Sequence, residues 1–374
     1  MTTAPGVSTR QALPGALVVA GLLISSAVAA GELSYGSISP PTHALITDGF
    51  QPYADKVKQE TGGKVSFQLF SGGSVVSAKT VLSGIGDGLV SSGYVVDAYI
   101  PQVLPNSNLS SDLGVYNKDA LSATAAATEY QLLNCPGCLK DMDKAGAVTL
   151  GVHSLAPYVL MCKTEVKSLA DLKGKKVKTA GLWGRLTAEF GMTPVNMPVT
   201  DIYEGLERGT LDCVLGPEGW LKSYNIWDSV RFVIEEPLGT WAGGHGMAVN
   251  KAAWTALSPD QRAVMLDNAP ALLTGMTLAY DHEAAIARAE AKKRDITYVA
   301  TLPGLDAAFQ QAREGVRAEA VKKAASRGVQ DPEAAAKTYR ALLGKWEKIV
   351  ADAKGDRTKI EAAMKAEIYD KLPN

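Results

Sequence analysis

The chain alternates between segments with the periodicity of strands and segments with the periodicity of helices. Residues 64–70 alternate polar and apolar side chains, which is typical of a strand with one buried face. Just before them, Phe50, Tyr53 and Val57 recur at helical spacing. Helices and strands continue in alternation to about residue 147. This order predicts a mainly parallel sheet with helices on both of its faces.

A second group of elements begins near residue 148 and alternates in the same way. Segments 82–93 and 206–216 echo each other, because each has a helix end, a glycine and then an apolar strand. In the second group, Thr200 is placed to cap a helix and Gly209 to end it. This weak internal repeat suggests two similar α/β lobes.

A long helical region follows the second group. Ser258, Pro259 and Gln261 have the order of a capping box with proline in the first turn, which predicts the start of a helix. From there to about Arg294 the sequence is rich in alanine and helical in pattern, and the region after Gly304 is helical as well. We therefore expect most of this last part of the chain to be helical.

Length and charge change the picture mainly by what they exclude. A chain of 374 residues is long enough for two domains of about 150 residues each. Its 38 Lys and Arg residues nearly balance its 39 Asp and Glu residues, so the net charge is −1. General nucleic-acid binding needs a broad basic face, and this balance argues against a nucleic-acid partner.

The first thirty residues differ from the rest of the chain. Arg10 is followed by an apolar run that ends in small residues at 27–30. This is the pattern of a secretory signal peptide, residues 1–30, and it predicts cleavage and export to the periplasm. An uncleaved membrane anchor is the alternative, although Pro14 and two serines interrupt the apolar run.

Export changes how the four cysteines are interpreted. An even number of cysteines in an oxidising compartment suggests two disulfides. Cys135 and Cys138 form a C-x-x-C pair, which is a spacing also found in redox-active sites. The flanking segments look like two helices joined by a turn, and this favours a structural bridge. Cys162 and Cys213 lack the paired ligand spacing of a structural zinc site, so no metal is expected.

Most motifs of catalytic sites are absent from the sequence. The zincin-like stretch at His282 lacks its second histidine, and the chain has neither a G-x-S-x-G elbow nor a phosphate-binding G-x-x-x-x-G-K-[ST] loop. Of the four histidines, His43 lies near the end of the first strand and His245 at a chain crossover. These two remain candidate site residues, and the balance shifts from catalysis towards ligand binding.

Four stretches taken together resemble the substrate-binding proteins of tripartite ATP-independent periplasmic (TRAP) transporters. The first two are SLADLKGKKVKTAG at 168–181 and FGMTPVNMPVTDIYEGLERGTLDCVLGP at 190–217. Segment 50–76 looks like the first lobe of that family, and segment 247–262 looks like its later strand and long helix. The resemblance covers roughly residues 31–350.

The resemblance implies an α/β, two-lobe periplasmic-binding-protein fold with an interlobe cleft and a long helix spanning both lobes. Residues 31–153 would then form the first part of lobe I and residues 154–241 the first part of lobe II. Residues 242–374 would supply return strands to lobe I, the spanning helix and C-terminal helices over both lobes. The resemblance also implies a receptor that captures a small organic acid and delivers it to integral membrane subunits. We expect such a receptor to be a monomer, without enzyme activity or a cofactor.

The segment 167–181 contains five lysines, and those around the turn at Gly174 are expected to be solvated. Lys178 lies on the following strand, at the position where the family usually has an arginine that clamps the ligand carboxylate. A lysine cannot make the planar, two-bond fork of an arginine. Arg185 follows seven residues later, and we expect it to share the role of carboxylate anchor or to take it over.

Other candidates follow from the rule that ligands of open α/β sheets bind beyond the carboxyl ends of the strands. For each aromatic side chain among them, packing in the core is the alternative. Several aromatic residues together suggest a ligand with an apolar or ring portion. The candidates at strand ends and crossovers are Ser39, His43, Ser74, Tyr94, Trp183, Glu218, Trp220, Trp241 and His245.

For the cysteines we predict the pairs Cys135–Cys138 and Cys162–Cys213, the second of which would join two strands of one lobe. Two rivals to a transport receptor stay open. The first is a periplasmic thiol oxidoreductase that uses the C-x-x-C pair. The second is a ligand-sensing subunit that presents the same ligand to a signalling partner.

Overall fold

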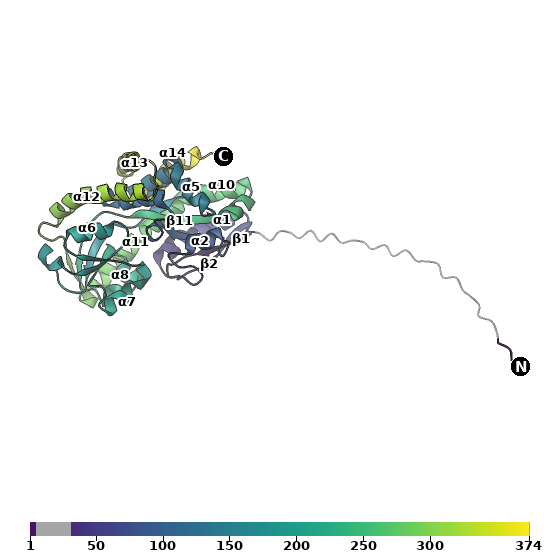
Figure 1. Ribbon diagram of the computed structural model, residues 1–374, viewed down its shortest axis with the longest axis horizontal. Helices are drawn as coiled ribbons and strands as arrows, with labels where there is room; N and C mark the ends of the chain where they lie inside the picture. The colour runs from purple at the N-terminus through teal and green to yellow at the C-terminus, as the bar shows by residue number, and fades with distance from the viewer. Residues whose placement is uncertain (5–30, 374) are drawn as a thin grey trace.

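The computed structural model describes residues 1–4 and 31–373. Most of the expected signal peptide, residues 5–30, lies outside the described residues. The described chain forms two α/β lobes, each built on its own six-stranded sheet, with the long helix α11 (Ala269–Ala291) between them (Figure 1). The two-lobe α/β architecture expected from the sequence is therefore confirmed.

The first lobe is built on a mixed sheet. Its strands are β1 (Gly31–Gly36), β2 (Val65–Phe70), β3 (Ser92–Val96), β4 (Ala147–Thr149), β5 (Val152–Ser154) and β11 (Ala242–Asn250). Strand β1 is parallel to β2 and β3, whereas β11 is antiparallel to β3, β4 and β5. The prediction of a mainly parallel sheet is wrong for this half. The reason is that β11 returns from the other lobe and enters the sheet at the end where β1 and β3 finish.

The second lobe is built on a mixed sheet as well. Its strands are β6 (Tyr158–Cys162), β7 (Lys176–Thr179), β8 (Thr193–Asn196), β9 (Cys213–Pro217), β10 (Phe232–Ile234) and β12 (Thr297–Val299). Strand β7 is parallel to β8 and β9, and β6 is antiparallel to β9 and β10. Because β12 follows α11 in sequence, the chain enters this lobe a second time.

Both predicted disulfides are confirmed. Cys162 and Cys213 lie directly opposite each other in the antiparallel pair β6–β9, with their Cα atoms 4.1 Å apart. Cys135 precedes helix α5 (Pro136–Lys144) and is bonded to Cys138 in its first turn. The four cysteines of the chain are thus all paired within the two lobes.

Two glycines allow neighbouring elements to approach α11 closely. A Cβ on Gly49, in the helical segment η1 (Leu45–Phe50) of the first lobe, would lie 2.5 Å from Cγ of Met276. A Cβ on Gly219, just before α8 (Trp220–Ser223) of the second lobe, would lie 2.9 Å from the carbonyl oxygen of Tyr280. Helix α11 therefore packs against both lobes at short range.

The C-terminal helices form a layer across both lobes. Helix α12 (Leu305–Ser326) contacts α3 (Pro105–Asp112) of the first lobe and α6 (Trp183–Glu189) of the second. Figure 1 shows α12 above α6, with α13 and α14 beyond it. The bounds of the other helices are α1 (Gln51–Glu60), α2 (Val81–Gly86), α4 (Ala120–Glu129), α7 (Ile202–Glu207), α9 (Lys251–Ala256), α10 (Pro259–Asp267), α13 (Pro332–Asp352) and α14 (Arg357–Glu367).

The local signals for helix ends give a mixed result. Ser258 and Gln261 form the expected capping box at the start of α10. Gly209 has a φ of 69° just after α7, so its role in ending that helix is confirmed. The cap at Thr200 is wrong, because the helix begins one residue later and the Thr200 hydroxyl donates to Asp201 Oδ1 at 2.8 Å. Among the described residues, none of the helices combines the length and hydrophobicity that a membrane crossing requires.

Candidate ligand-binding site

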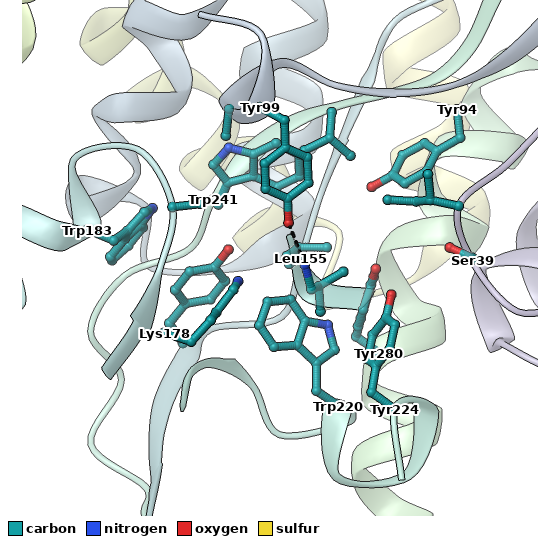
Figure 2. Close-up of a pocket in the computed structure, with 16 residues that line it drawn as sticks. Ser39, Tyr94, Tyr99, Leu155, Lys178, Trp183, Trp220, Tyr224, Trp241 and Tyr280 are labelled. Carbon is teal, nitrogen blue, oxygen red and sulfur yellow. Dashed lines mark hydrogen bonds between the residues drawn. The ribbon is translucent and has the colours of Figure 1, made fainter. Parts of the chain in front are cut away.

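A cavity lies between the two lobes, with about 490 Å³ of space that protein atoms do not fill. Both sheets contribute to its walls, as do α8 and α11. Figure 2 shows Ser39 and Tyr94 on one side of the space and Lys178 and Trp183 on the other. The lining residues are Ile38, Ser39, Tyr94, Val96, Ala98, Tyr99, Leu155, Tyr158, Lys178, Ala180, Trp183, Val199, Trp220, Tyr224, Trp241 and Tyr280.

Lys178 places one amino group in an otherwise uncharged cavity wall. The side chain leaves β7 near its carboxyl end, and the residue is only 2% exposed. Its Nζ lies 4.3 Å from the centre of the Trp220 ring, which is a cation–π contact. No carboxylate of the described residues lies within 4.0 Å of it. Because an unpaired buried cation is unfavourable, the cavity is suited to an anion.

Burial also controls the charge of Lys178. Desolvation lowers the pKa of its amino group from 10.5 to about 7. The ammonium form is therefore only partly populated at neutral pH in the ligand-free protein, and a bound anion would favour it.

Aromatic rings form most of the remaining wall. Tyr158 packs against Trp183 with ring centres 4.6 Å apart and against Trp220 at 6.1 Å. The rings of Trp220 and Tyr224 meet edge to face at 6.0 Å. Such walls offer large apolar surfaces and specific ring contacts to a planar ligand.

Two indole groups in the wall have unused hydrogen-bonding capacity. The Nε1 atoms of Trp220 and Trp241 are buried, and neither has a hydrogen-bond partner among the described residues. A buried donor without a partner typically costs about 1–3 kcal/mol. Both donors belong to side chains that line the cavity, so they are candidates for a hydrogen bond to a ligand oxygen.

A hydrogen bond between the lobes closes one side of the cavity. The backbone N–H of Val199, in the second lobe, donates to the hydroxyl of Tyr99, in the first lobe, at 3.0 Å (Figure 2). Burial raises the pKa of Tyr99 to about 12, so the phenol stays neutral at physiological pH. The Tyr94 hydroxyl is engaged with His153 Nε2 at 3.1 Å. The structure therefore shows the two lobes in a closed arrangement.

Six of the residues expected near the ligand do line the cavity: Ser39, Tyr94, Lys178, Trp183, Trp220 and Trp241. The structure places Arg185 elsewhere, half exposed and paired with Glu189 at 3.0 Å. Successive helical residues are about 100° apart, so Arg185 lies about 200° around α6 from Trp183, which faces the cavity. The anchor candidates therefore separate, with Lys178 inside and Arg185 outside.

The other four expected residues lie away from the cavity wall. Ser74 is exposed at the surface. Glu218 accepts hydrogen bonds from Arg288 and from the hydroxyl of Tyr298. His245 is buried and contacts the hydroxyls of Ser107 and Thr149, and His43 lies behind the rings of Tyr224 and Tyr280. Desolvation lowers the pKa of both histidines to about 3, so neither offers a positive charge to an anion.

Four tyrosines of the wall were not expected from the sequence. Tyr99 follows the end of β3, so the strand-end rule could have identified it. Tyr158 lies in a continuously buried strand, and Tyr280 lies in the middle of α11. Tyr224 follows the short helix α8. For these three, the local pattern does not differ from that of ordinary core residues.

Comparison with known proteins gives a consistent result. A family model described as bacterial extracellular solute-binding protein, family 7, matches residues 36–324. The 2,3-diketo-L-gulonate-binding periplasmic protein YiaO of Escherichia coli is 25% identical over 267 residues, which are 68% of this chain and 77% of that relative.

Two solved structures of TRAP solute-binding proteins are also similar. The one from Bordetella bronchiseptica, with bound (R)- and (S)-mandelate, is 25% identical with a TM-score of 0.72, and the match covers 84% of this chain and 99% of that one. The one from Rhodoferax ferrireducens, in complex with copurified benzoate, is 23% identical with a TM-score of 0.76, and the match covers 86% and 99%.

The two lobes and the closed cavity between them define a solute-binding protein of the TRAP type. The chain belongs to bacterial extracellular solute-binding protein family 7. The resemblance seen in the sequence is therefore confirmed, and the protein functions as a solute-binding receptor.

Proposed function

We propose that this receptor captures a small aromatic monocarboxylate and that Lys178 holds the carboxylate. The receptor would deliver this ligand to the integral membrane subunits of a TRAP transporter. The single observation that carries the proposal is the Lys178 amino group, buried and without an acidic partner among the described residues, in a cavity walled by aromatic rings.

The charge of the cavity favours one carboxylate. Lys178 is the only Lys, Arg, Asp, Glu or His among the described residues that line it. A dicarboxylate would bring a second buried charge without a partner, which is strongly unfavourable. The indole N–H groups of Trp220 and Trp241 have no partner among the described residues and are candidates to donate to the carboxylate or to a neighbouring hydroxyl.

The walls of the cavity favour a ring over a polyhydroxylated chain. A sugar acid needs a hydrogen-bond partner for each buried hydroxyl, and unsatisfied groups weaken its binding. Among the relatives, the Bordetella bronchiseptica protein binds mandelate, which has a phenyl ring, and the Escherichia coli protein is named for diketogulonate, which has none. The aromatic lining supports the mandelate-like alternative.

The disulfides argue against the thiol-oxidoreductase rival. Both cysteine pairs are bonded and buried, and this offers no free thiol for oxidoreductase chemistry. We propose that the protein is not an enzyme and that it is exported as a monomer through a cleaved signal peptide at residues 1–30. A sensor subunit would bind the same ligand, so uptake distinguishes it: cells that lack this receptor should fail to accumulate the acid.

A thermal-shift screen on unfolded and refolded protein tests the ligand class. The panel should contain mandelate, benzoate and phenylacetate beside sugar acids and aliphatic dicarboxylates. A matching acid at about 100 times its Kd should add roughly 2.7 kcal/mol to the free energy of unfolding. We expect the aromatic monocarboxylates to give the largest shifts. A clear response to sugar acids or dicarboxylates alone would refute the proposed ligand class.

A further inference from the structure

Behind the cavity, the carboxylate of Glu283 lies between the two lobes. Glu283 belongs to α11 and its side chain is fully buried. Its Oε1 accepts a hydrogen bond from the backbone N–H of Ala44, in the first lobe, at 3.0 Å. The same oxygen accepts from Nζ of Lys222, in the second lobe, at 3.3 Å. Oε2 accepts from the hydroxyl of Ser223. One carboxylate thus binds both lobes to the helix that they share.

These contacts lie directly behind residues that line the cavity. Tyr280 is one turn before Glu283 on α11, and Tyr224 follows Ser223 in sequence. Both rings face the cavity, where Figure 2 shows them side by side. The hydrogen bonds of Glu283 therefore fix the position of α8, and with it the position of Tyr224, relative to the first lobe.

His43 does not replace this role. Its Nδ1 lies 3.8 Å from Oε2 of Glu283, but that nitrogen accepts a hydrogen bond from the backbone N–H of Leu45 at 3.0 Å. A nitrogen that accepts this bond carries no proton to donate to the carboxylate. Lys222 is thus the cation that faces Glu283.

We propose that Glu283 is a positioning residue that holds the two lobes in the closed arrangement around the ligand. Opening of the cleft would move Ala44, in the first lobe, away from Lys222 and Ser223, in the second. The buried carboxylate of Glu283 would then lose some of its hydrogen bonds. The hydrogen bonds that are lost on opening therefore stabilise the closed state relative to the open one. This inference rests on the proposed function only in assuming that the ligand occupies the cavity between the lobes.

The distance between the lobes tests the proposal directly. Leu89 of the first lobe and Tyr203 of the second are exposed, and the four native cysteines are paired, so Leu89→Cys and Tyr203→Cys provide two sites for spin labels. The distribution of distances between the two spin labels is measured by pulsed electron–electron double resonance, without ligand and with saturating mandelate. The comparison uses Glu283→Gln, which nearly keeps the shape of the side chain, and Glu290→Gln as a control. Glu290 lies on the same helix but pairs only with the exposed Lys293 among the described residues.

We expect Glu283→Gln to shift the distribution towards longer distances, with and without mandelate, and to weaken mandelate binding about 10- to 150-fold. Glu290→Gln should behave like the parent. A closed distribution and parental affinity in Glu283→Gln would overturn the proposal. The proposal would also fail if Glu283→Gln lost both thermal stability and affinity while the distances between the labels stayed unchanged, because a purely structural role predicts that result.

Lys222→Met covers the case in which Glu283→Gln does not fold. Lys222 is partly exposed, so its replacement should be tolerated, and it should also lengthen the distances. If Lys222→Met leaves the distances unchanged while Glu283→Gln unfolds, the carboxylate supports the fold alone and the proposal fails. If the parent binds no aromatic acid, the ligand proposal fails, but the distances measured without ligand still decide the role of Glu283.

Discussion

Replacement of Lys178 with methionine should weaken mandelate binding about 10- to 150-fold. The side chain keeps nearly the same length and loses its charge, and a hydrogen bond to a charged group contributes about 1.5–3 kcal/mol. The closed cavity strengthens the bond, because water does not compete for either partner. Lys178→Arg keeps a charge, and it should retain much of the affinity or change which acid is preferred.

The same lysine predicts how affinity depends on pH. In the ligand-free protein, burial lowers the pKa of Lys178 to about 7. A bound carboxylate favours the ammonium form, so the pKa is higher in the complex. Affinity should be greatest below about pH 7 and fall by up to about tenfold per pH unit above it, until the pH reaches the pKa of the complex. In Lys178→Arg the affinity should be flat, because the guanidinium stays charged.

Isothermal titration calorimetry of mandelate from about pH 6 to about pH 9 measures both effects, within the interval over which the free lysine titrates. Circular dichroism must first show that each variant is folded. Equal affinity of the parent and Lys178→Met at every pH would refute the role of Lys178. If the affinity of the parent does not change with pH while Lys178→Met binds weakly, the lowered pKa of Lys178 is refuted but its role as the carboxylate anchor is not.

Three further predictions concern stability and the indole donors. Ligand-free Lys178→Met should resist urea better than the parent at neutral pH. Burial lowers the pKa of Lys178 from 10.5 to about 7, so the folded parent is destabilised at neutral pH and regains this stability only as the pH rises from about 7 to 10.5. Equal urea midpoints would contradict this. Replacing Cys162 and Cys213 with alanine should lower the free energy of unfolding by about 4 kcal/mol, since the bridge spans a sequence separation of 51; unchanged urea unfolding would contradict it. Trp241→Phe should weaken mandelate binding roughly 2- to 12-fold by calorimetry, without lowering the melting temperature of the ligand-free protein.

The features that the sequence predicted correctly depend on local or regular patterns. The alternation of strands and helices and the family-like segments identified the two-lobe fold. Cys162 and Cys213 were predictable as a pair because both lie on strands of one lobe. Lys178 was a candidate because it occupies the position where the family usually has a carboxylate-clamping arginine. The structure places it in the cavity wall, and its role as the anchor stays a prediction.

The features that were missed depend on how distant segments meet. The direction of β11 follows from its return between lobes, which no local periodicity records. Arg185 is close to Lys178 in sequence, but the turn of α6 carries it to the outer face. Tyr224 and Tyr280 come from two elements far apart in sequence, α8 and α11, whose close approach is allowed by Gly219. A site formed between two lobes is therefore the part of the molecule that sequence patterns describe least.

One calorimetric comparison tests the central claim most directly. The refolded protein is titrated with mandelate and with mandelamide, which has the same ring and hydroxyl but no charge. The cavity described above, with one buried lysine among aromatic rings, predicts that mandelate binds with one molecule per chain and that mandelamide binds at least about tenfold more weakly. Equal binding of the two compounds, or binding of neither by a protein that does bind a sugar acid, would contradict the claim that Lys178 and the aromatic wall select an aromatic carboxylate.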